Sequence, residues 1–251
     1  MPSDAHAPAL GKTAAALDVR EVTVRFGGNV ALDSVTFSAA PGLVTGLIGP
    51  NGAGKTTLFN VITGLLPASV GQVLIEGTNV SKTRPSSRAR LGMARTFQRL
   101  ELFSLLSVRE NVRGAVDIRR TGGSDPQGFV DHVIERVGLS DVADARVDSL
   151  STGRARLVEL GRALATKPKV LLLDEPASGQ DENETDAFGQ LLQELAREGI
   201  AVVLVEHDMQ LVMQVCDMIH VLDFGRIIAA GTPQEIQHDE AVLAAYLGTK
   251  S

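Results

Sequence analysis

The sequence has no tryptophan, one tyrosine and one cysteine, and it contains no long apolar run. The single cysteine, Cys216, excludes an internal disulfide and is typical of proteins from a reducing compartment. Its apolar neighbours favour a small core residue over a catalytic thiol. A helix that crosses a bilayer needs roughly 18 or more consecutive apolar residues. Because no segment approaches that length, any association with a membrane would be made through a partner.

Basic residues are also in the minority, since 24 lysines and arginines stand against 30 aspartates and glutamates, a formal net charge of −6. Proteins that bind nucleic acid usually have a basic excess, so no nucleic-acid partner is expected. Residues 1–16 are rich in alanine and proline and lack a basic segment followed by an apolar one. They predict a flexible tail rather than a secretory signal, and hence a cytoplasmic location.

A glycine-rich segment of the form G-x-x-x-x-G-K-[ST] is the most specific feature of the chain. It lies between residues 43–48, which predict a buried strand, and residues 56–62, which predict an amphipathic helix. Such a turn directs backbone N–H groups and the positive end of a helix dipole at one point, where a polyphosphate is held. The segment consists of Gly49, Pro50, Asn51, Gly52, Ala53, Gly54, Lys55 and Thr56, followed by Thr57.

Two side chains of this segment have predicted roles. Lys55 is placed to reach the β- and γ-phosphates, and the Thr56 hydroxyl is placed to ligate Mg²⁺. The alternative is a glycine-rich turn that binds nothing, and the strand before it and the helix after it disfavour that alternative. The sequence therefore predicts a site for a nucleoside triphosphate and Mg²⁺.

The remaining segments predict an α/β fold: a phosphate-loop NTPase core with a mixed sheet, a small antiparallel β subdomain and an inserted helical subdomain. Residues 17–26 and 34–39 predict an antiparallel pair of strands. Further strands are predicted at residues 71–75, 93–97, 170–173, 201–205 and 218–222, and helices at 84–91, 108–116, 129–137, 150–166 and 182–198. One domain is expected over residues 17–251, with the helical insertion at about 99–148.

Two carboxylates follow the buried strand predicted at residues 170–173. Asp174 and Glu175 would lie at the carboxyl end of a parallel strand, where doubly wound sheets bind their ligands. Asp174 is a candidate to hold Mg²⁺, and Glu175 is a candidate to polarise a water for in-line attack on the γ-phosphate. His207 follows a later strand, and it either contacts the same phosphate or caps the next helix. Phe26 either stacks on a nucleotide base or is a core or rim residue.

Taken in linear order, these features resemble the ATP-binding subunit of an ATP-binding-cassette (ABC) transporter. The diagnostic segment is Leu150-Ser151-Thr152-Gly153, which lies immediately before a helix and before the strand that leads to Asp174 and Glu175. The resemblance covers residues 17–248. It implies ATP and Mg²⁺ as cofactors and hydrolysis of ATP to ADP and phosphate. The implied roles are adenine stacking for Phe26, sensing of Mg²⁺ and the attacking water for Gln98, general base for Glu175, and γ-phosphate switch for His207.

The signature segment implies a head-to-tail dimer of ATPase subunits. Ser151, Thr152 and Gly153 at a helix N-terminus form a second anion site. The resemblance implies that Ser151 and Gly153 contact the γ-phosphate bound in the opposite subunit. Asp181 would belong to the loop that crosses to that subunit.

Three residues depart from the family pattern. Thr152 replaces a glycine (or, in one branch, an aromatic residue), Arg154 replaces a glutamine, and Gln180 replaces a leucine. We expect a working but weakened signature. In a dimer of two different ATPases, it would slow hydrolysis at the partner's phosphate loop rather than at the loop that contains Lys55.

Three short segments, residues 92–98, 206–209 and 245–248, are similar to the ATPases of branched-chain amino acid importers. The near relatives of those ATPases move urea and short amides. The similarity implies an ATPase that energises uptake of branched-chain or other hydrophobic amino acids. The implied partners are two separate membrane permeases, a second ATPase subunit, identical or different, and indirectly an extracytoplasmic substrate-binding protein. The implied location is the cytoplasmic face of the membrane, as a peripheral subunit.

Other functions stay open at this point. They are a urea or short-amide importer ATPase, an exporter ATPase, a soluble regulatory ABC ATPase without a membrane partner, and a nucleotide-sensing subunit with impaired hydrolysis. The surface that couples to a permease is expected at residues 98–113. There Phe103, Leu105 and Leu106 either receive a helix of the membrane subunit or pack in the core of the insertion.

Overall fold

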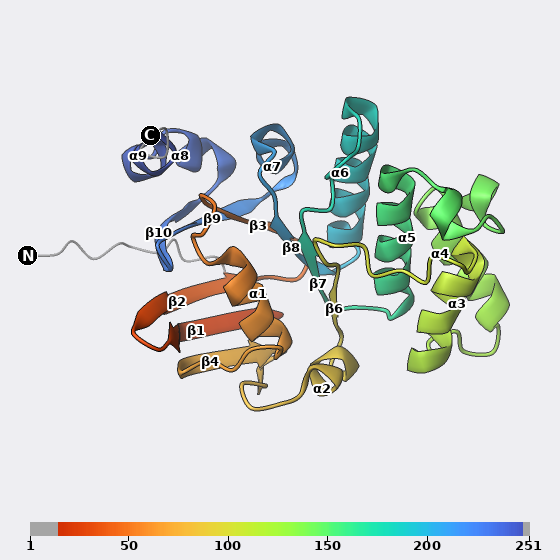
Figure 1. Ribbon diagram of the computed structural model, residues 1–251, viewed down its shortest axis with the longest axis horizontal. Coiled ribbons are helices and arrows are strands. Elements are labelled where there is room, and N and C mark those ends of the chain that lie inside the picture. The colour runs from red at the N-terminus through yellow and green to blue at the C-terminus, as the bar shows by residue number, and fades with distance from the viewer. Residues whose placement is uncertain (1–14, 248–251) are drawn as a thin grey trace, which may run out of the picture.

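The computed structural model describes residues 15–247, which form two β-sheets and a group of helices (Figure 1). One sheet is antiparallel, in the order β2 (Asn29–Ala39), β1 (Leu17–Phe26), β4 (Val70–Ile75) and β5 (Thr78–Asn79). The other has the order β10 (Arg226–Gly231), β9 (Met218–Asp223), β3 (Val44–Ile48), β8 (Ala201–Val205), β7 (Val170–Asp174) and β6 (Met93–Arg95).

The antiparallel sheet begins at the first described residues. Strand β1 pairs with β2 on one side and with β4 on the other, so that Leu17 lies opposite both Ala39 and Ile75. The predicted pairing of the first two strands is confirmed, and the second of them begins earlier than expected, at Asn29. Ala16, the last residue of the predicted tail, is buried and donates to the Ala39 carbonyl over 3.0 Å. Residues 1–14 of that tail lie outside the described residues.

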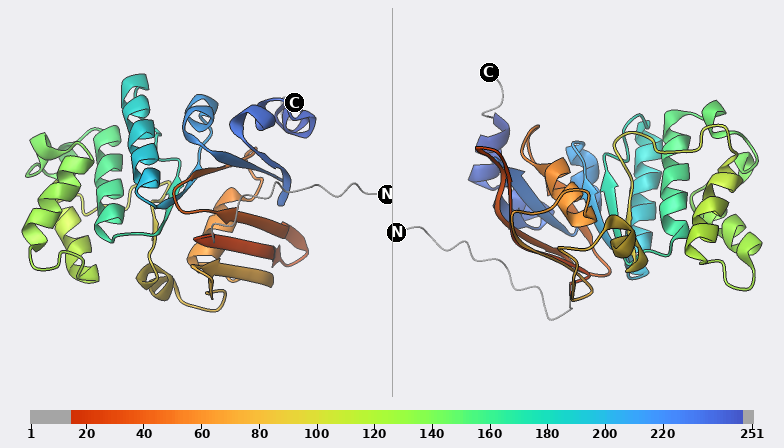
Figure 2. Two further views of the ribbon diagram at one scale, coloured as in Figure 1. Left: turned by 180° about the vertical axis from the view of Figure 1, so that it is seen from behind. Right: turned by 60° about the horizontal axis from the view of Figure 1, so that its bottom comes forward.

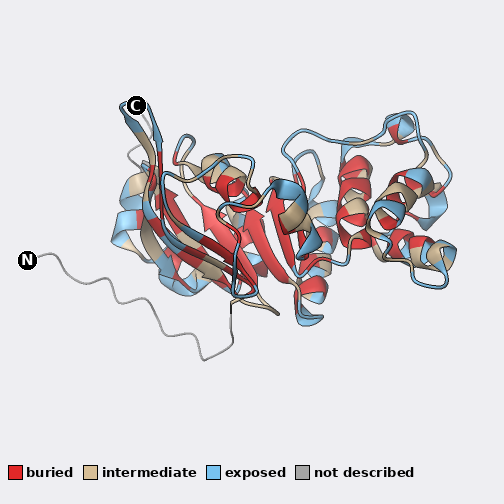
Figure 3. Cartoon of the chain, turned by 90° about the horizontal axis from the view of Figure 1, so that it is seen from below, coloured by how far each residue is buried: buried red, intermediate tan, exposed pale blue. Residues whose placement is uncertain are grey.

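The second sheet is mixed, as predicted. Strands β6, β7, β8, β3 and β9 run parallel, and β10 returns antiparallel to β9. Every residue of β3, β7 and β8 is buried (Figure 3). Burial on both faces explains the unbroken apolar sequences of β8 and of residues 170–173. Alternate residues face two different cores: Leu47 packs with α1 (Lys55–Thr63) and the antiparallel sheet, whereas Ile48 packs with the helices of the other face.

The helices of that other face lie in two groups (Figures 1 and 2). One group covers the sheet and comprises α6 (Glu182–Arg197), α7 (Met209–Val215), α8 (Pro233–Gln237) and α9 (Glu240–Leu247). The other extends away from the antiparallel sheet and comprises α3 (Val108–Arg119), α4 (Pro126–Arg136), α5 (Thr152–Ala165) and the 3₁₀ turns η1 (Ser140–Val142) and η2 (Val147–Ser149).

The helix starts follow local capping chemistry. Ser107 and Glu110 form a reciprocal capping box at the start of α3, and Asp125 caps α4 just before Pro126. Both predicted helices of the insertion are therefore confirmed, with α3 ending at Arg119 rather than at residue 116. The predicted helix at residues 84–91 is α2 (Pro85–Arg90). No helix among residues 15–247 is long and apolar enough to span a bilayer.

Candidate active site

The glycine-rich loop connects the end of β3 to the start of α1, as predicted. Gly49 and Gly54 have φ angles of 151° and 112°, and a side chain at either position would collide with the fold. A Cβ on Gly49 would lie 1.9 Å from the Leu222 carbonyl oxygen, and one on Gly54 would lie 2.8 Å from the Leu32 side chain. No side chain caps the start of α1 and its first turn has no acidic residue. The free N–H groups of that turn therefore suit an anion.

Lys55 is folded back over this loop. Its Nζ donates to the carbonyl of Gly49 over 2.5 Å and to that of Pro50 over 3.0 Å. Burial lowers the pKa of Lys55, and the charges of Glu175 and Asp174 act in the opposite direction. The ammonium group therefore lies on the loop, where it feels the charge of both predicted carboxylates.

The carboxyl ends of β3, β8 and β7 meet at one edge of the sheet, because these strands are parallel neighbours. This places the phosphate loop, His207 and the acidic pair at the same edge, which is where doubly wound sheets bind ligands. Residues that are far apart in the sequence thus form one site.

Asp174, the last residue of β7, is held by a buried arginine. Arg95 on the edge strand β6 donates from Nη2 to Asp174 Oδ2 over 2.9 Å, and both side chains are about 5% exposed. Its Nη1 donates to Asn60 on α1 over 2.7 Å. The guanidinium carbon also lies 4.8 Å from the ring centre of Phe97. Sequence reasoning assigned no role to Arg95, although a basic residue in a predicted buried strand is a signal for a buried ion pair.

Glu175 and Gln98 contact each other directly. Gln98 donates from Nε2 to Glu175 Oε2 over 3.0 Å. Glu175 itself has a φ of 50°, an uncommon angle for a residue with a side chain, and its N–H donates to Val205 over 2.9 Å. Such backbone angles cost roughly 1–3 kcal/mol and cluster at functional sites. The strained turn marks the point where the chain leaves the buried strand and enters the site.

His207 is 73% exposed and lies beside the buried carboxylate of Glu206. Glu206 accepts from the N–H groups of Ala177 and His207 over 2.9 and 3.1 Å. Burial raises the pKa of Glu206, and these hydrogen bonds oppose the rise. The next helix is capped by Asp208, which accepts from two N–H groups of α7, so the capping alternative for His207 is wrong. Glu206, which ties the segment after β7 to the end of β8, was not singled out from the sequence.

The signature segment lies against the start of α6. Ser151 caps α5 by accepting from Arg154 N–H over 3.3 Å, and Arg154 pairs with Asp141 over 2.8 Å. A Cβ on the buried Gly153 would lie 2.9 Å from the carboxylate of Glu184. Ser151 and Thr152 are exposed.

Asp181 and Glu184 form the capping box of α6. The role expected of Asp181, in a loop that crosses to a second subunit, stays a prediction, and its side chain is exposed at the helix start.

Phe26 ends β1 and is 52% exposed, so the alternative of a core residue is wrong. Its ring is available for stacking on a base or forms part of the rim.

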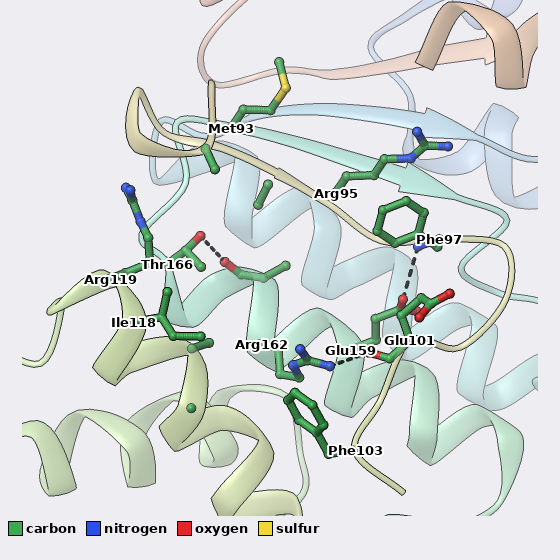
Figure 4. A pocket seen from close by; sticks show the side chains of 15 residues that line it. Met93, Arg95, Phe97, Glu101, Phe103, Ile118, Arg119, Glu159, Arg162 and Thr166 are labelled. Atoms are coloured by element: carbon green, nitrogen blue, oxygen red, sulfur yellow. Dashed lines mark hydrogen bonds between the residues drawn. The ribbon is translucent and has the colours of Figure 1, made fainter. Parts of the chain in front are cut away.

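A cavity of about 360 Å³ lies between α3, α5 and the segment after β6 (Figure 4). Phe103 and Ile118 form part of its wall and are 55% and 81% exposed. Leu105 and Leu106 are also exposed, so the three apolar residues predicted for a coupling surface do not pack in the core of the insertion. The pocket wall also contains Arg95. It is therefore adjacent to the site described above.

A phosphate-binding loop after one parallel strand, with acidic residues and a histidine after the next two, defines a phosphate-loop NTPase. A family model described as "ABC transporter" matches residues 32–178, and one described as "Branched-chain amino acid ATP-binding cassette transporter" matches residues 226–250. The chain therefore belongs to the ABC transporter family and is an ATPase of that family.

Known relatives agree with this assignment over nearly the whole chain. The chain is 35% identical to the high-affinity branched-chain amino acid transport ATP-binding protein BraF of Pseudomonas aeruginosa, over 92% of this chain and 97% of BraF. It is 32% identical to the lipopolysaccharide export system ATP-binding protein LptB of Escherichia coli, over 93% and 98%. The crystal structure of the ADP conformation of MJ1267, an ABC transporter cassette, superimposes with a TM-score of 0.84 at 32% identity and covers 94% of this chain and 100% of that one.

Proposed function

We propose that this ATPase energises the import of branched-chain or other hydrophobic amino acids. The observation that carries the proposal is the match of residues 226–250 to the branched-chain model, because this segment lies outside the catalytic core. The similarity to BraF over nearly the full length of both chains supports it. The similarity to LptB favours export as the second candidate, since the two identities differ little.

ATP would be bound by residues 49–57, with Phe26 against the adenine. The oxygens of Thr56, Asp174 and Gln98 fit Mg²⁺, which prefers hard oxygen donors and usually takes one or two protein carboxylates together with phosphate oxygens. Among the described residues no group of three or more His, Cys, Asp or Glu side chains is placed to hold a metal ion. The phosphates of ATP would therefore complete the coordination, and bound Mg²⁺ would neutralise charge on them.

Glu175 would accept the proton of the attacking water, because its carboxylate lies at the strand end beside the loop that holds the phosphates. Gln98, which donates to that carboxylate, would orient both the base and the water. The exposed imidazole of His207 would contact the γ-phosphate. The exposed signature residues Ser151 and Thr152 would face the ATP of a second ATPase subunit packed head to tail.

The cavity of Figure 4 would receive a helix of a membrane permease. Its exposed wall residues Phe103 and Ile118 suit apolar side chains. Arg95, Arg119 and Arg162 also line it. A docking segment with apolar side chains would suit the exposed wall residues.

The weakened signature is a part of the proposal that can be tested separately. Thr152 is exposed, and the Arg154 guanidinium is engaged with Asp141. If the partner is a different ATPase, hydrolysis at the partner's phosphate loop should be the slower of the two. Reconstitution of both subunits with one site inactivated at a time measures this, and equal rates would contradict it.

The decisive experiment is purification of the tagged full chain from gently solubilised membranes, followed by identification of the proteins that accompany it. We expect two permeases and an ATPase partner, and uptake of labelled leucine by cells that depends on Lys55. Lys82→Ala, a change at an exposed lysine outside the site, is the matched control for Lys55→Ala. Urea uptake instead of leucine uptake would reassign the substrate. A membrane complex without uptake would favour export, and no membrane partner at all would favour a regulatory ATPase.

A further inference from the structure

Helix α5 holds the segment before Gln98 with a buried ion pair. Arg156 donates from Nη1 to the Phe97 carbonyl over 2.7 Å and from Nη2 to the Gln98 carbonyl. Glu159 accepts the Phe97 backbone N–H on Oε1 over 3.1 Å. The two side chains pair with each other over 3.3 Å and are 7% and 6% exposed. One turn of α5 thus binds both the N–H and the C=O of Phe97, and we call this pair the clamp.

The same face of α5 extends the contact one turn further. Residues three apart in a helix lie on one face, and Arg162 follows Glu159 at that spacing. Arg162 donates to the Glu101 carbonyl, and its guanidinium carbon lies 4.9 Å from the ring centre of Phe103. Figure 4 shows the hydrogen bond between Phe97 and Glu159 in the wall of the cavity.

The clamp lies between three functional regions. At its N-terminal end, α5 starts at the signature residue Thr152 and is capped by Ser151. On the catalytic side, the clamped Gln98 donates to Glu175. On the outer side, Glu159 and Phe97 line the cavity beside Arg162. A displacement of the cavity wall or of α5 therefore acts on the backbone that carries Gln98.

We propose that Arg156 and Glu159 are positioning residues that hold Gln98 in its orientation against Glu175. Through them, a movement of the cavity wall or of α5 changes the contact between Gln98 and Glu175. The proposal rests on the hydrolytic roles proposed above for Gln98 and Glu175, and it is independent of the transported substrate. Neither residue of the clamp belongs to the segments proposed to bind ATP; both act through Gln98.

Physical chemistry favours this role over one in stability alone. Burial raises the pKa of Glu159, whereas the Phe97 N–H and the charge of Arg156 oppose the rise. A buried ion pair is a weak source of net stability, because removing both charges from water costs about as much as their attraction returns. What the pair supplies is a defined geometry, since two side chains and three backbone groups must meet at fixed distances.

The test uses two conservative variants of the full chain, alone and with any subunits that co-purify. Glu159→Gln keeps the shape and an oxygen acceptor for Phe97 but removes the charge opposite Arg156. Arg156→Lys keeps the charge but loses the planar fork that reaches two carbonyls. Glu198→Gln is the matched control, because Glu198 also pairs with an arginine, Arg136, but is 51% exposed on its side chain. Each variant is measured for kcat, KM for ATP, thermal midpoint and hydrogen exchange of residues 97–103.

We expect both clamp variants to lower kcat on the order of 10- to 100-fold with little change in KM, as for a small misplacement of a catalytic group. Exchange at residues 97–103 should rise, and the control should match the parent protein. In a Gln98→Ala background the clamp variants should add no further loss of kcat.

Two results would overturn the proposal: unchanged exchange at residues 97–103, or losses that add in full to that of Gln98→Ala. If Gln98→Ala alone leaves kcat intact, the proposed role of Gln98 is wrong, and the exchange data still decide whether the clamp exists. If Glu159→Gln does not fold, Arg156→Lys carries the test.

Discussion

Gln98 and Glu175 are 77 positions apart in the sequence, and the Gln98 amide donates to the Glu175 carboxylate over 3.0 Å. The contact joins the loop after an edge strand to the strained turn after β7. It also connects the outer cavity to the phosphate edge of the sheet, since the cavity wall includes Phe97, the neighbour of Gln98. Substitutions at this edge of the sheet and at the buried ionic groups around it should have distinct effects on hydrolysis, binding and stability.

Glu175→Gln should slow turnover on the order of 10²–10⁴-fold and leave ATP binding intact, because the amide keeps the shape of the side chain but accepts no proton. Steady-state hydrolysis and equilibrium binding of ATP measure the two effects. Glu76→Gln changes an exposed glutamate paired with Lys169 and serves as the control. An unchanged rate in Glu175→Gln would remove the general-base assignment.

Lys55→Ala should weaken nucleotide binding by about tenfold or more, because a hydrogen bond to a charged group contributes roughly 1.5–3 kcal/mol. The lysine that now bonds to the Gly49 and Pro50 carbonyls would turn to the phosphates when ATP binds. Calorimetric titration with ATP measures the change. Equal affinity in the variant and the parent would show that the phosphates are held by the backbone alone.

Arg95→Met should lower the free energy of unfolding by about 3–5 kcal/mol, because it leaves the buried Asp174 carboxylate without its partner. The double variant Arg95→Met, Asp174→Asn should be less destabilised than the sum of the two single changes. Arg20→Met breaks the exposed pair with Asp18 and should cost about 1 kcal/mol or less. Urea denaturation compares the two single variants, the double variant and Arg20→Met with the parent protein. A loss in Arg95→Met no larger than in Arg20→Met would mean that the pair is not a buried constraint.

His220 should make the fold sensitive to mild acid. Burial lowers the pKa of His220 from 6.5 to about 4, and its Nδ1 has no hydrogen-bond partner among the described residues. Between these two values the unfolded chain takes up a proton that the folded chain does not. Stability contributed by the neutral ring is therefore complete above pH 6.5 and falls as the pH drops toward 4, by up to about 3 kcal/mol.

Urea midpoints measured across this range should fall less steeply in His220→Gln than in the parent protein. The carboxyl groups titrate in both proteins and cancel in the comparison. His238→Gln, at an exposed position, is the control. Parallel pH profiles for the parent and His220→Gln would contradict the assignment.

Features whose residues lie close together in the chain could be predicted from the local sequence alone. The phosphate loop could be predicted in full, because its glycines, its lysine and the flanking strand and helix lie within one short segment. The same holds for the acids at the end of β7, since an unbroken apolar run predicts a buried strand. The helix starts at Ser107 and Asp181 agree with the predicted starts at residues 108 and 182, whereas the start at Asp125 lies before the predicted one at residue 129.

The order of these segments along the chain determined the class of protein and its predicted catalytic residues. The sequence did not reveal the partners of the buried charges: Arg95 with Asp174, Glu206 with the segment after β7, and Arg156 and Glu159 with Phe97. Nor did it show that β4 joins the antiparallel sheet. Each of these depends on which strands become neighbours and which helix face turns inward. Only the packing of the whole chain decides that, because the hydrophobic burial that drives it is non-directional and is shared by many residues.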